Sequence, residues 1–379
     1  MRPNGYVKEE LSEIYDATVD FVANEVTPVA DLWEEQGQVP RSIVRQMGDL
    51  GMLGLRVPEK FGGMGLGPLA SAVFSEALGT STYGGFDVTI LVHTDMSTPH
   101  LINAGTDEQK AEFFPKILTG ETIVSIGVTE PDAGSDVAGI RTKAIKDGDG
   151  WVINGNKTYI TNAVYGDMTI IAARTNPEHK YGISMFMVDN DTEGFEVTKK
   201  LNKTGWLCSD TAELNLQDVW VPAERMLGEE HRGFYAIMEN FQTERMVLIG
   251  MGLGAAQTAI DITVEHAKAR AAFGGKLFDL GTIRQRMGLA QAKVDAVRSS
   301  MYHAAWLEEQ GIDNVREMSG VKAFGAEVIN QVMYECVQFH GGLGYMRESA
   351  IERMSRDARI LPIGGGATEV MLEEVAKRL

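Results

Sequence analysis

A loop of small and polar residues is the first segment of this chain whose composition could support chemistry. It runs from Gly127 to Asp136, with the sequence GVTEPDAGSD. Hydroxyls and small residues in a loop that leaves a strand can present backbone N–H groups to an anion or a polar heterocycle. The same Pro, Asp, Gly and Ser residues are also what a surface turn requires. Composition alone leaves both interpretations open.

Metal and disulfide chemistry find little support in the sequence. The two cysteines, Cys208 and Cys336, are far apart and outside any CxxC spacing. The seven histidines are scattered, without an HExxH or other paired-ligand spacing. Two thiols in a chain of 379 residues indicate a reducing compartment, with no disulfide framework and no zinc cluster. We therefore predict no metal.

The acidic net charge limits the classes of partner that this protein can bind. The chain has 35 Lys and Arg against 53 Asp and Glu, a formal net charge of −18. An acidic surface repels nucleic acid phosphates and anionic membranes, so we expect neither as a partner. An anionic ligand must then be bound by local Arg side chains, backbone N–H groups or helix N-termini.

The N-terminal sequence and the apolar runs bear on location. No apolar run approaches the roughly 20 residues that cross a bilayer. The first residues, MRPNGYVKEELSEIYD, lack the apolar stretch of a secretory signal and the Arg-rich character of a transit peptide. We expect a cytoplasmic protein.

The elements that must position these residues change in character twice along the chain. Helical spacing prevails at first, period-two β-branched segments such as WVINGNKTYIT and MTIIAART follow, and long helical patterns then return. Asp147-Gly148 and Asn154-Gly155 predict turns within the β region. We predict an α-helical domain over residues 1–120, a β domain over 121–228 and a helical bundle over 229–379.

Two ordered strings give the loop a more specific meaning. TEPDAGSD (129–136) is followed by WVINGNKTYITNA (151–163), and the pair resembles the flavin-binding signature of the acyl-CoA dehydrogenase family. The resemblance covers nearly the whole chain and includes RAAFG (270–274), QFHGGLG (338–344) and RDAR (356–359). It implies an α+β fold with an N-terminal helical domain, a middle β-barrel-like domain and a C-terminal four-helix bundle.

The resemblance also implies FAD as the cofactor. The residues at its binding positions are Val128, Thr129, Ser135, Tyr159, Ile160, Thr161, Arg270, Phe273, Gln338, Gly341, Gly342, Thr368 and Glu369. Val128 and Thr129 would hydrogen-bond the pyrimidine edge, Thr161 would contact the N5 region, and Tyr159 replaces the common Trp that packs on the ring. The five residues from Arg270 to Gly342 would bind the FAD of a neighbouring subunit, in a homotetramer built as a dimer of dimers.

The catalytic base implied by the family is a carboxylate that removes the α-proton of an acyl thioester while the β-hydrogen leaves as hydride. Many members carry this Glu shortly after RDA[RK], where Gly365 stands here. By itself Glu244 is typical of a solvated helix glutamate. Its position 26 residues before Arg270 nevertheless resembles the isovaleryl-CoA and long-chain branches. Because Gly365 leaves the other position empty, we predict Glu244 as the base, with a pKa raised by an apolar pocket.

The same resemblance gives the positions that would bind substrate. They are Ser135, Tyr235, Gln242, Arg245, Gly365 and Gly366. Tyr235 is equally consistent with a core aromatic, and Arg245 with a structural ion pair. The backbone N–H of Gly365 would be one donor to the thioester carbonyl.

The predicted function is the α,β-dehydrogenation of a fatty or branched-chain acyl-CoA to the trans-2-enoyl-CoA, with electrons passed to an electron-transfer flavoprotein. Gly281, Leu207 and Ala367 depart from common family residues, so the acyl group stays open. One alternative is a dehydrogenase of a thioester bound to an acyl carrier protein. Another is a non-catalytic, DNA-binding family member, against which the acidic total and Glu244 both argue.

Overall fold

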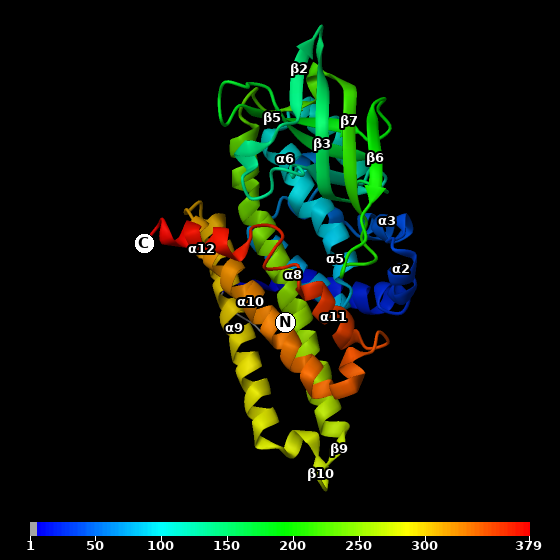
Figure 1. The fold of residues 1–379 in the computed structure, drawn as a ribbon, viewed down its shortest axis with the longest axis vertical. Helices are drawn as coiled ribbons and strands as arrows, with labels where there is room; N and C mark the ends of the chain where they lie inside the picture. Colours follow the sequence, from blue (N-terminus) through cyan, green and yellow to red (C-terminus); the bar gives the residue numbers. More distant parts are fainter. Residues whose placement is uncertain (1–5) are drawn as a thin grey trace.

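The computed structural model describes residues 6–379. Figure 1 shows the β domain at one end, the N-terminal helices beside its base, and long C-terminal helices that extend to the other end. One helix, α8 (Gly233–Ala269), runs through most of this length and contacts both other parts. The candidate base lies on this helix, so its packing decides the site.

The N-terminal part is helical, as its spacing predicts. Its helices are α1 (Glu9–Phe21), α2 (Ala30–Gln36), α3 (Arg41–Asp49), α4 (Pro68–Leu78), α5 (Gly84–Leu91), α6 (Thr98–Ala104) and α7 (Asp107–Leu118), with π-helical turns η1 (Val22–Val26) and η5 (Val92–Ser97). Every residue of α4 and α5 is buried. These two are therefore core helices with no solvent face, and α4 packs directly against α8.

His93 joins the helical part to the β domain. Its Nδ1 accepts from the backbone N–H of Val124 at 3.1 Å, so its Nε2 carries the proton and donates to the Ile117 carbonyl, also at 3.1 Å. Burial lowers the pKa of His93 to about 4. The imidazole is thus a neutral structural link.

The β domain is a sheet that contains most of the second flavin string in one of its inner strands, β3 (Gly150–Thr161). Its strands are β1 (Val124–Gly127), β2 (Lys143–Asp147), β3 (Gly150–Thr161), β4 (Met168–Arg174), β5 (Ile183–Asp189), β6 (Phe195–Lys200), β7 (Thr211–Pro222) and β8 (Met226–Leu227). Across the described residues the order is β6-β7-β3-β2-β4-β5-β8, with β1 paired in parallel to β4. Hydrogen bonding leaves this path open between β6 and β8.

One expected turn lies inside a strand. Asp147 pairs with Gly150 in a tight β2–β3 hairpin, as predicted. Asn154-Gly155 instead continues β3, where the register against β7 shifts between Ile153 and Gly155. The prediction of a turn here was wrong, because pairing with both β2 and β7 holds the segment extended and uses the glycine for a β-bulge.

The C-terminal part contains three long helices and two short ones. These are α8, α9 (Gly281–Glu309), α10 (Val315–His340), α11 (Ala350–Ala358) and α12 (Thr368–Ala376), with a small hairpin of β9 (Ala271–Ala272) and β10 (Gly275–Lys276) after α8. By length and composition α8 could cross a membrane, which its sequence did not lead us to expect. However, 67% of its most apolar window is buried inside the fold, against α4, α9 and α10.

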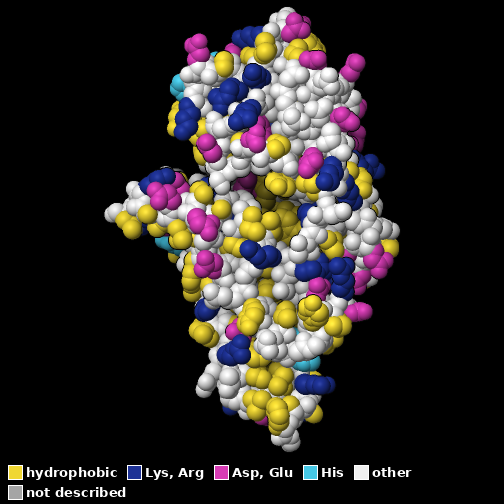
Figure 2. Space-filling view, viewed as in Figure 1, with side chains coloured by type: hydrophobic (Ala, Val, Ile, Leu, Met, Phe, Trp, Pro, Cys, Tyr) yellow, Lys and Arg dark blue, Asp and Glu magenta, His cyan; other side chains and the backbone are white. Residues whose placement is uncertain are grey.

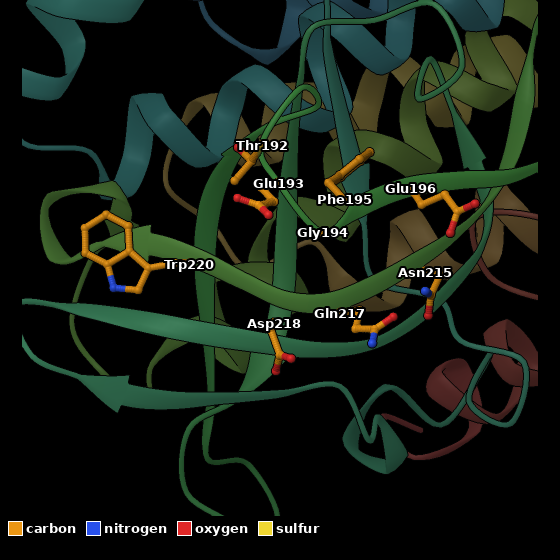
Figure 3. Close-up of a pocket in the computed structure, with 9 residues that line it drawn as sticks. All are labelled: Thr192, Glu193, Gly194, Phe195, Glu196, Asn215, Gln217, Asp218 and Trp220. Carbon is orange, nitrogen blue, oxygen red and sulfur yellow. The ribbon is translucent and has the colours of Figure 1, made fainter.

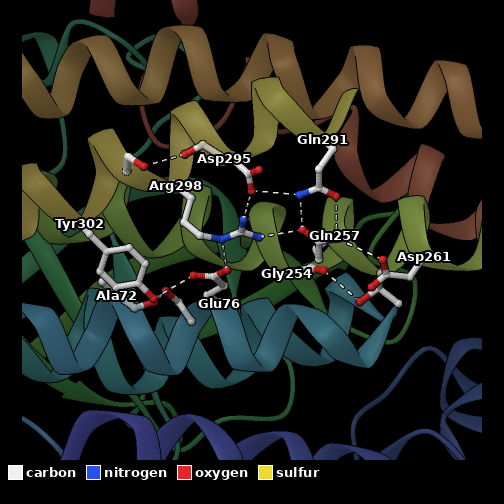
Figure 4. Close-up of polar contacts among 12 residues, drawn as sticks. Ala72, Glu76, Gly254, Gln257, Asp261, Gln291, Asp295, Arg298 and Tyr302 are labelled. Atoms are coloured by element: carbon white, nitrogen blue, oxygen red, sulfur yellow. Dashed lines mark hydrogen bonds and ion pairs between the residues drawn. The ribbon is translucent and has the colours of Figure 1, made fainter. Parts of the chain in front are cut away.

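A polar network fastens α4, α8 and α9 together (Figure 4). Glu76 accepts from Arg298 Nε at 2.6 Å and from the Tyr302 hydroxyl at 2.8 Å. Arg298 also donates to Asp295 at 2.8 Å and to Gln257 at 3.2 Å. Because the Glu76 side chain is only 3% exposed, these bonds satisfy a charge that burial would otherwise make costly.

Candidate active site

Glu244 is a buried carboxyl held by one neighbour on its own helix. It is 9% exposed, and its Oε1 accepts from Asn240 Nδ2 at 3.2 Å. Burial raises the pKa of Glu244 to about 8, against the opposing effects of the Asn240 hydrogen bond and the Arg245 charge. A carboxylate whose pKa lies near the working pH is a stronger base than a solvated one. Glu244 is therefore equipped for proton abstraction.

A glycine-rich turn lies beside the same stretch of α8. Gly365 and Gly366 have φ of 63° and 107°, in the region that favours glycine. Lys322, buried on α10, donates from Nζ to the carbonyls of Leu361 at 2.5 Å and Gly366 at 3.0 Å. Burial and the charge of Arg245 lower the pKa of Lys322 to about 8. The turn is thus fixed from the bundle side by one ammonium group.

Arg245 is the cation whose charge acts on Glu244. It is 8% exposed, its Nη1 donates to Gln242 Oε1 at 3.3 Å, and its guanidinium lies 5.6 Å from the Phe241 ring centroid. Its Nε has no hydrogen-bond partner among the described residues. In a protein of net charge −18, Arg245 and Lys322 create a local positive field suited to negative charge that develops on a substrate.

The first flavin string is anchored by a buried ion pair. Lys157 Nζ bonds Glu130 Oε1 at 2.8 Å and the Val128 carbonyl at 3.1 Å. Glu130 Oε1 also accepts the backbone N–H of Thr142 at 3.0 Å, and Oε2 accepts that of Arg141 at 2.6 Å. The loop from Val128 to Thr142 is therefore clamped at both ends, and the acidic residue of the string serves the loop itself.

The second flavin string lies next to the first. The N–H of Thr158 donates to the Thr129 carbonyl at 3.0 Å, which brings the end of β3 beside the end of β1. Tyr159 has φ 62° and is 69% exposed, whereas the side chain of Ile160 is buried in the sheet core. Ser135 is exposed in the loop and Thr161 is half-buried.

A second set of predicted cofactor residues lies far from Glu244. Arg270, Phe273, Gln338, Gly341 and Gly342 are all exposed, near the end of the bundle opposite the β domain (Figure 1). Arg270 follows Glu244 by 26 residues, which is roughly 39 Å of helix at about 1.5 Å per residue. Phe273 is 94% exposed. One chain does not bring this set and Glu244 together.

Tyr235 also lies apart from Glu244. It sits in an aromatic cluster with Tyr181 and Phe234 and under the guanidinium of Arg232, 4.3 Å from its ring centroid. Nine residues separate it from Glu244, and at about 100° per residue they point to roughly opposite sides of α8. A substrate contact at Tyr235 stays a prediction.

Thr368 and Glu369, two further predicted cofactor-binding residues, are the first residues of α12. The Thr368 N–H donates to the Pro362 carbonyl at 3.1 Å, and Thr368 is buried while Glu369 is exposed. Thr368 therefore closes the turn that holds Gly365, and only Glu369 of the two projects to the surface.

A recess and a separate groove hollow the surface around the β domain. Figure 2 shows a recess below the β domain with hydrophobic side chains in it. Figure 3 shows a separate groove of about 640 Å³ over β6 and β7, lined by Thr192, Glu193, Gly194, Phe195, Glu196, Asn215, Gln217, Asp218 and Trp220. This groove contains none of the predicted site residues, and its acidic lining does not favour a CoA phosphate.

The structure thus places a buried carboxyl beside a glycine-rich turn, and three family models match the chain. They are the acyl-CoA dehydrogenase N-terminal domain (residues 8–121), middle domain (125–219) and C-terminal domain (231–379). The protein belongs to the acyl-CoA dehydrogenase family.

Individual relatives agree with this assignment. The chain is 37% identical to the long-chain specific acyl-CoA dehydrogenase of Rattus norvegicus, over 95% of this chain and 84% of that protein. It is 32% identical to the isovaleryl-CoA dehydrogenase of Pongo abelii, over 96% and 87%. It is also 32% identical to the caffeyl-CoA reductase–Etf complex subunit CarC of Acetobacterium woodii, over 96% and 97%.

Solved structures share the whole fold. An acyl-CoA dehydrogenase from Geobacillus kaustophilus matches with a TM-score of 0.94 and 38% identity, over 99% of both chains. An FAD complex of PigA matches with a TM-score of 0.95 and 26% identity, over 100% and 99%. The prolyl acyl carrier protein oxidase AnaB matches with a TM-score of 0.93 and 26% identity, over 98% and 99%.

The cofactor is FAD, as in members of this family. The residues present fit it: the clamped loop at Val128 and Thr129 adjoins an exposed aromatic, Tyr159, that can stack on a ring. At the far end, Gly341 and Gly342 have no atom within 4 Å of an added Cβ, so a ligand can approach their backbone closely.

Three supporting residues were missed from the sequence. Asn240 precedes Glu244 by four residues, a spacing that places both on one helix face. That spacing could have identified Asn240 as a partner of Glu244. Lys157 lies inside the second string but was given no role. Lys322 is far from every motif, and nothing in its local sequence indicates that it holds the Gly365 turn.

Proposed function

We propose that this protein oxidises the Cα–Cβ bond of an acyl-CoA thioester, with Glu244 as the base. The observation that carries the proposal is the buried Glu244 carboxyl, whose pKa is raised to about 8. The neighbouring turn has Gly365 at the position where many family members carry the catalytic Glu. A solvated structural glutamate would have neither the burial nor the neighbouring glycine turn.

The chemistry balances as a proton and a hydride. Glu244 takes the proton from Cα, the new double bond forms between Cα and Cβ, and FAD supplies the acceptor for the hydride that leaves Cβ. Negative charge that builds on the thioester oxygen is stabilised by backbone N–H donors such as that of Gly365 and by the field of Arg245 and Lys322. The product is the trans-2-enoyl-CoA.

The substrate is a fatty or branched-chain acyl-CoA, in line with the long-chain and isovaleryl-CoA relatives. The electrons pass to an electron-transfer flavoprotein, since one relative is named as a subunit of an Etf complex. A thioester on an acyl carrier protein is the second candidate, supported by the likeness to AnaB.

The working assembly is a homotetramer, a dimer of dimers, in the cytoplasm. The support is the separation of Glu244 from Arg270, roughly 39 Å along the helix, and the almost complete exposure of Phe273 (94%). A neighbouring subunit can supply these residues to the FAD that serves Glu244.

Anaerobic titration of the oxidised flavin band tests the proposal. We expect straight or branched acyl-CoAs to bleach the wild-type flavin, and Glu244→Gln to bind FAD without bleaching. Bleaching only by acyl-carrier-protein thioesters would select the second candidate. Rapid bleaching of Glu244→Gln by any thioester would remove Glu244 as the base.

A further inference from the structure

Asn240 ties the candidate base to a different element of the fold. Its Nδ2 donates to the Met96 carbonyl in η5 at 2.9 Å and to Glu244 Oε1 at 3.2 Å. Asn240 is itself buried, at 3% exposure. The two N–H groups of one side-chain amide thus donate to two acceptors, the Met96 backbone carbonyl and the Glu244 carboxyl.

The bond to Met96 fixes the direction of the bond to Glu244. The Met96 carbonyl belongs to the turn at Val92–Ser97, which is buried throughout. With one hydrogen directed at that carbonyl, the second is aimed at the carboxyl one helical turn away. The orientation of the donor therefore does not depend on the position of Glu244.

We infer that Asn240 is a positioning residue that orients the Glu244 carboxyl and favours its ionised form. This inference rests on the proposed function. An amide N–H stabilises a carboxylate more than a carboxylic acid, so Asn240 partly offsets the desolvation of the base. It also leaves the second oxygen of Glu244 free to receive a proton from substrate.

The other charged groups around this part of α8 are already engaged or neutral. On the packed elements they are Glu76 of α4, Asp87 of α5, Asp95 of η5, His100 of α6, Arg298 and Glu308 of α9, Lys322 of α10 and Asp357 of α11. Arg298 pairs with Glu76, and Glu308 accepts from the Thr243 hydroxyl and lies 3.9 Å from Arg56. Asp95 accepts from the Ser71 and Thr94 hydroxyls, and burial lowers the pKa of His100 to about 4. Among the charged neighbours, Arg245 acts on the pKa of Glu244. The hydrogen-bond partner of the Glu244 carboxyl is Asn240.

A purely structural role predicts a different outcome from a positioning role. Asn is a less favourable residue than Ala in a helix interior, and here it joins α8 to η5. If that link were its whole purpose, its loss would lower stability and leave the pH dependence of the reaction unchanged.

The test compares Asn240→Leu with a matched control, Asn330→Leu. Asn330 also sits on a long helix and donates from one Nδ2 to two carbonyls, those of Ala326 at 2.9 Å and Ala358 at 2.8 Å. It has no carboxyl partner. The measurement is the rate of flavin reduction by the acyl-CoA that bleaches the wild type, followed anaerobically by stopped flow from pH 6 to pH 9.

In Asn240→Leu we expect the midpoint of the pH profile to rise by about one unit, because the ionised base loses a hydrogen bond. The reduction rate then falls about tenfold near pH 7 and approaches the wild-type rate at pH 9. Asn330→Leu keeps the wild-type midpoint. If Asn240→Leu does not fold with FAD, Asn240→Ala removes the same donor without added bulk and carries the same expectation.

The outcomes separate the inference from the proposed function. If no thioester reduces the wild-type flavin, the proposed function fails. If the wild type is reduced and the Asn240 variants keep its midpoint, the inference alone is overturned. The same shift in Asn330→Leu would also overturn it, since a general loosening of the helices would then explain the effect.

Discussion

A Cβ added to Gly365 would lie 2.3 Å from Cδ1 of Leu248. Leu248 follows Glu244 by four residues on α8, so it points to the same side one turn further on. The space that a carboxyl side chain at residue 365 needs is thus filled by a buried leucine beside the existing base. A side chain at residue 365 therefore requires Leu248 to shift, at a backbone position whose φ of 63° favours glycine.

Moving the base should fail unless Leu248 is reduced. We expect Glu244→Gly with Gly365→Glu to reduce its flavin no faster than Glu244→Gly alone, because the new side chain collides with Leu248. Adding Leu248→Ala should raise that rate at least tenfold. The positive φ at residue 365 still costs a non-glycine residue roughly 1–2 kcal/mol, so wild-type rates are not expected. Equal rates in the double and triple variants would show that Leu248 does not control the position.

The raised pKa of Glu244 predicts an effect of pH on stability. Its pKa is about 8 folded against 4.5 as a model value, so the folded state binds the proton more tightly. The carboxyl contributes fully below pH 4.5, and this contribution is lost as the pH rises through 8. The loss at pH 8 is at most roughly 4 kcal/mol.

Glu244→Gln removes this titration. Thermal unfolding of holoprotein should show a higher Tm for the variant than for the wild type at pH 8, with the gap closing at pH 5. A variant that is less stable than the wild type at pH 8 would contradict a desolvated carboxyl.

The Lys157–Glu130 pair should decide FAD retention. Lys157→Met leaves Glu130 buried without its cation, which typically costs about 3–5 kcal/mol, and frees the Val128–Thr142 loop. We expect loss of bound FAD, measured as flavin absorbance per chain after gel filtration. Arg141→Ala is the control in the same loop, since its pair with Asp132 is 78% and 68% exposed and should be nearly silent. Full FAD occupancy in Lys157→Met would refute the clamp.

The hydrogen-bond network around Glu76 should stabilise the packing of α4, α8 and α9 without affecting the rate of flavin reduction. Glu76→Ala leaves Arg298 mostly buried and unpaired from α4, which typically costs about 3–5 kcal/mol, so Tm should fall. Reductive rates at 20 °C, per bound FAD, should stay near the wild-type value. Lys60→Ala, in the exposed pair with Asp107, is the control and should leave Tm unchanged. A Tm loss as large in the control would show that surface pairs matter equally.

The sequence determined the elements and identified the two strings that resemble a flavin-binding signature. Helical periodicity identified the long helices, and period-two segments identified the strands around Trp151 and Met168, because local side-chain alternation reflects which face is buried. The exchange of Gly365 for Glu244 could also be read directly, since it depends on residue type at fixed motif spacing. Even the distance from Glu244 to Arg270 follows from a continuous helix.

Only the tertiary structure decided how these residues are held. Asn154-Gly155 has the composition of a turn and became a bulge, since two neighbouring strands compete for its backbone. Tyr235 and Glu244 share a helix, yet α8 packs so that Tyr235 joins Tyr181 in a separate cluster. Lys322 reaches the Gly365 turn from another helix, and Met96 directs Asn240 toward Glu244. Such contacts join residues far apart in the chain, and local sequence does not encode which of them meet. The candidate base was thus identifiable from the sequence, while the burial and orientation of its carboxyl arise from packing.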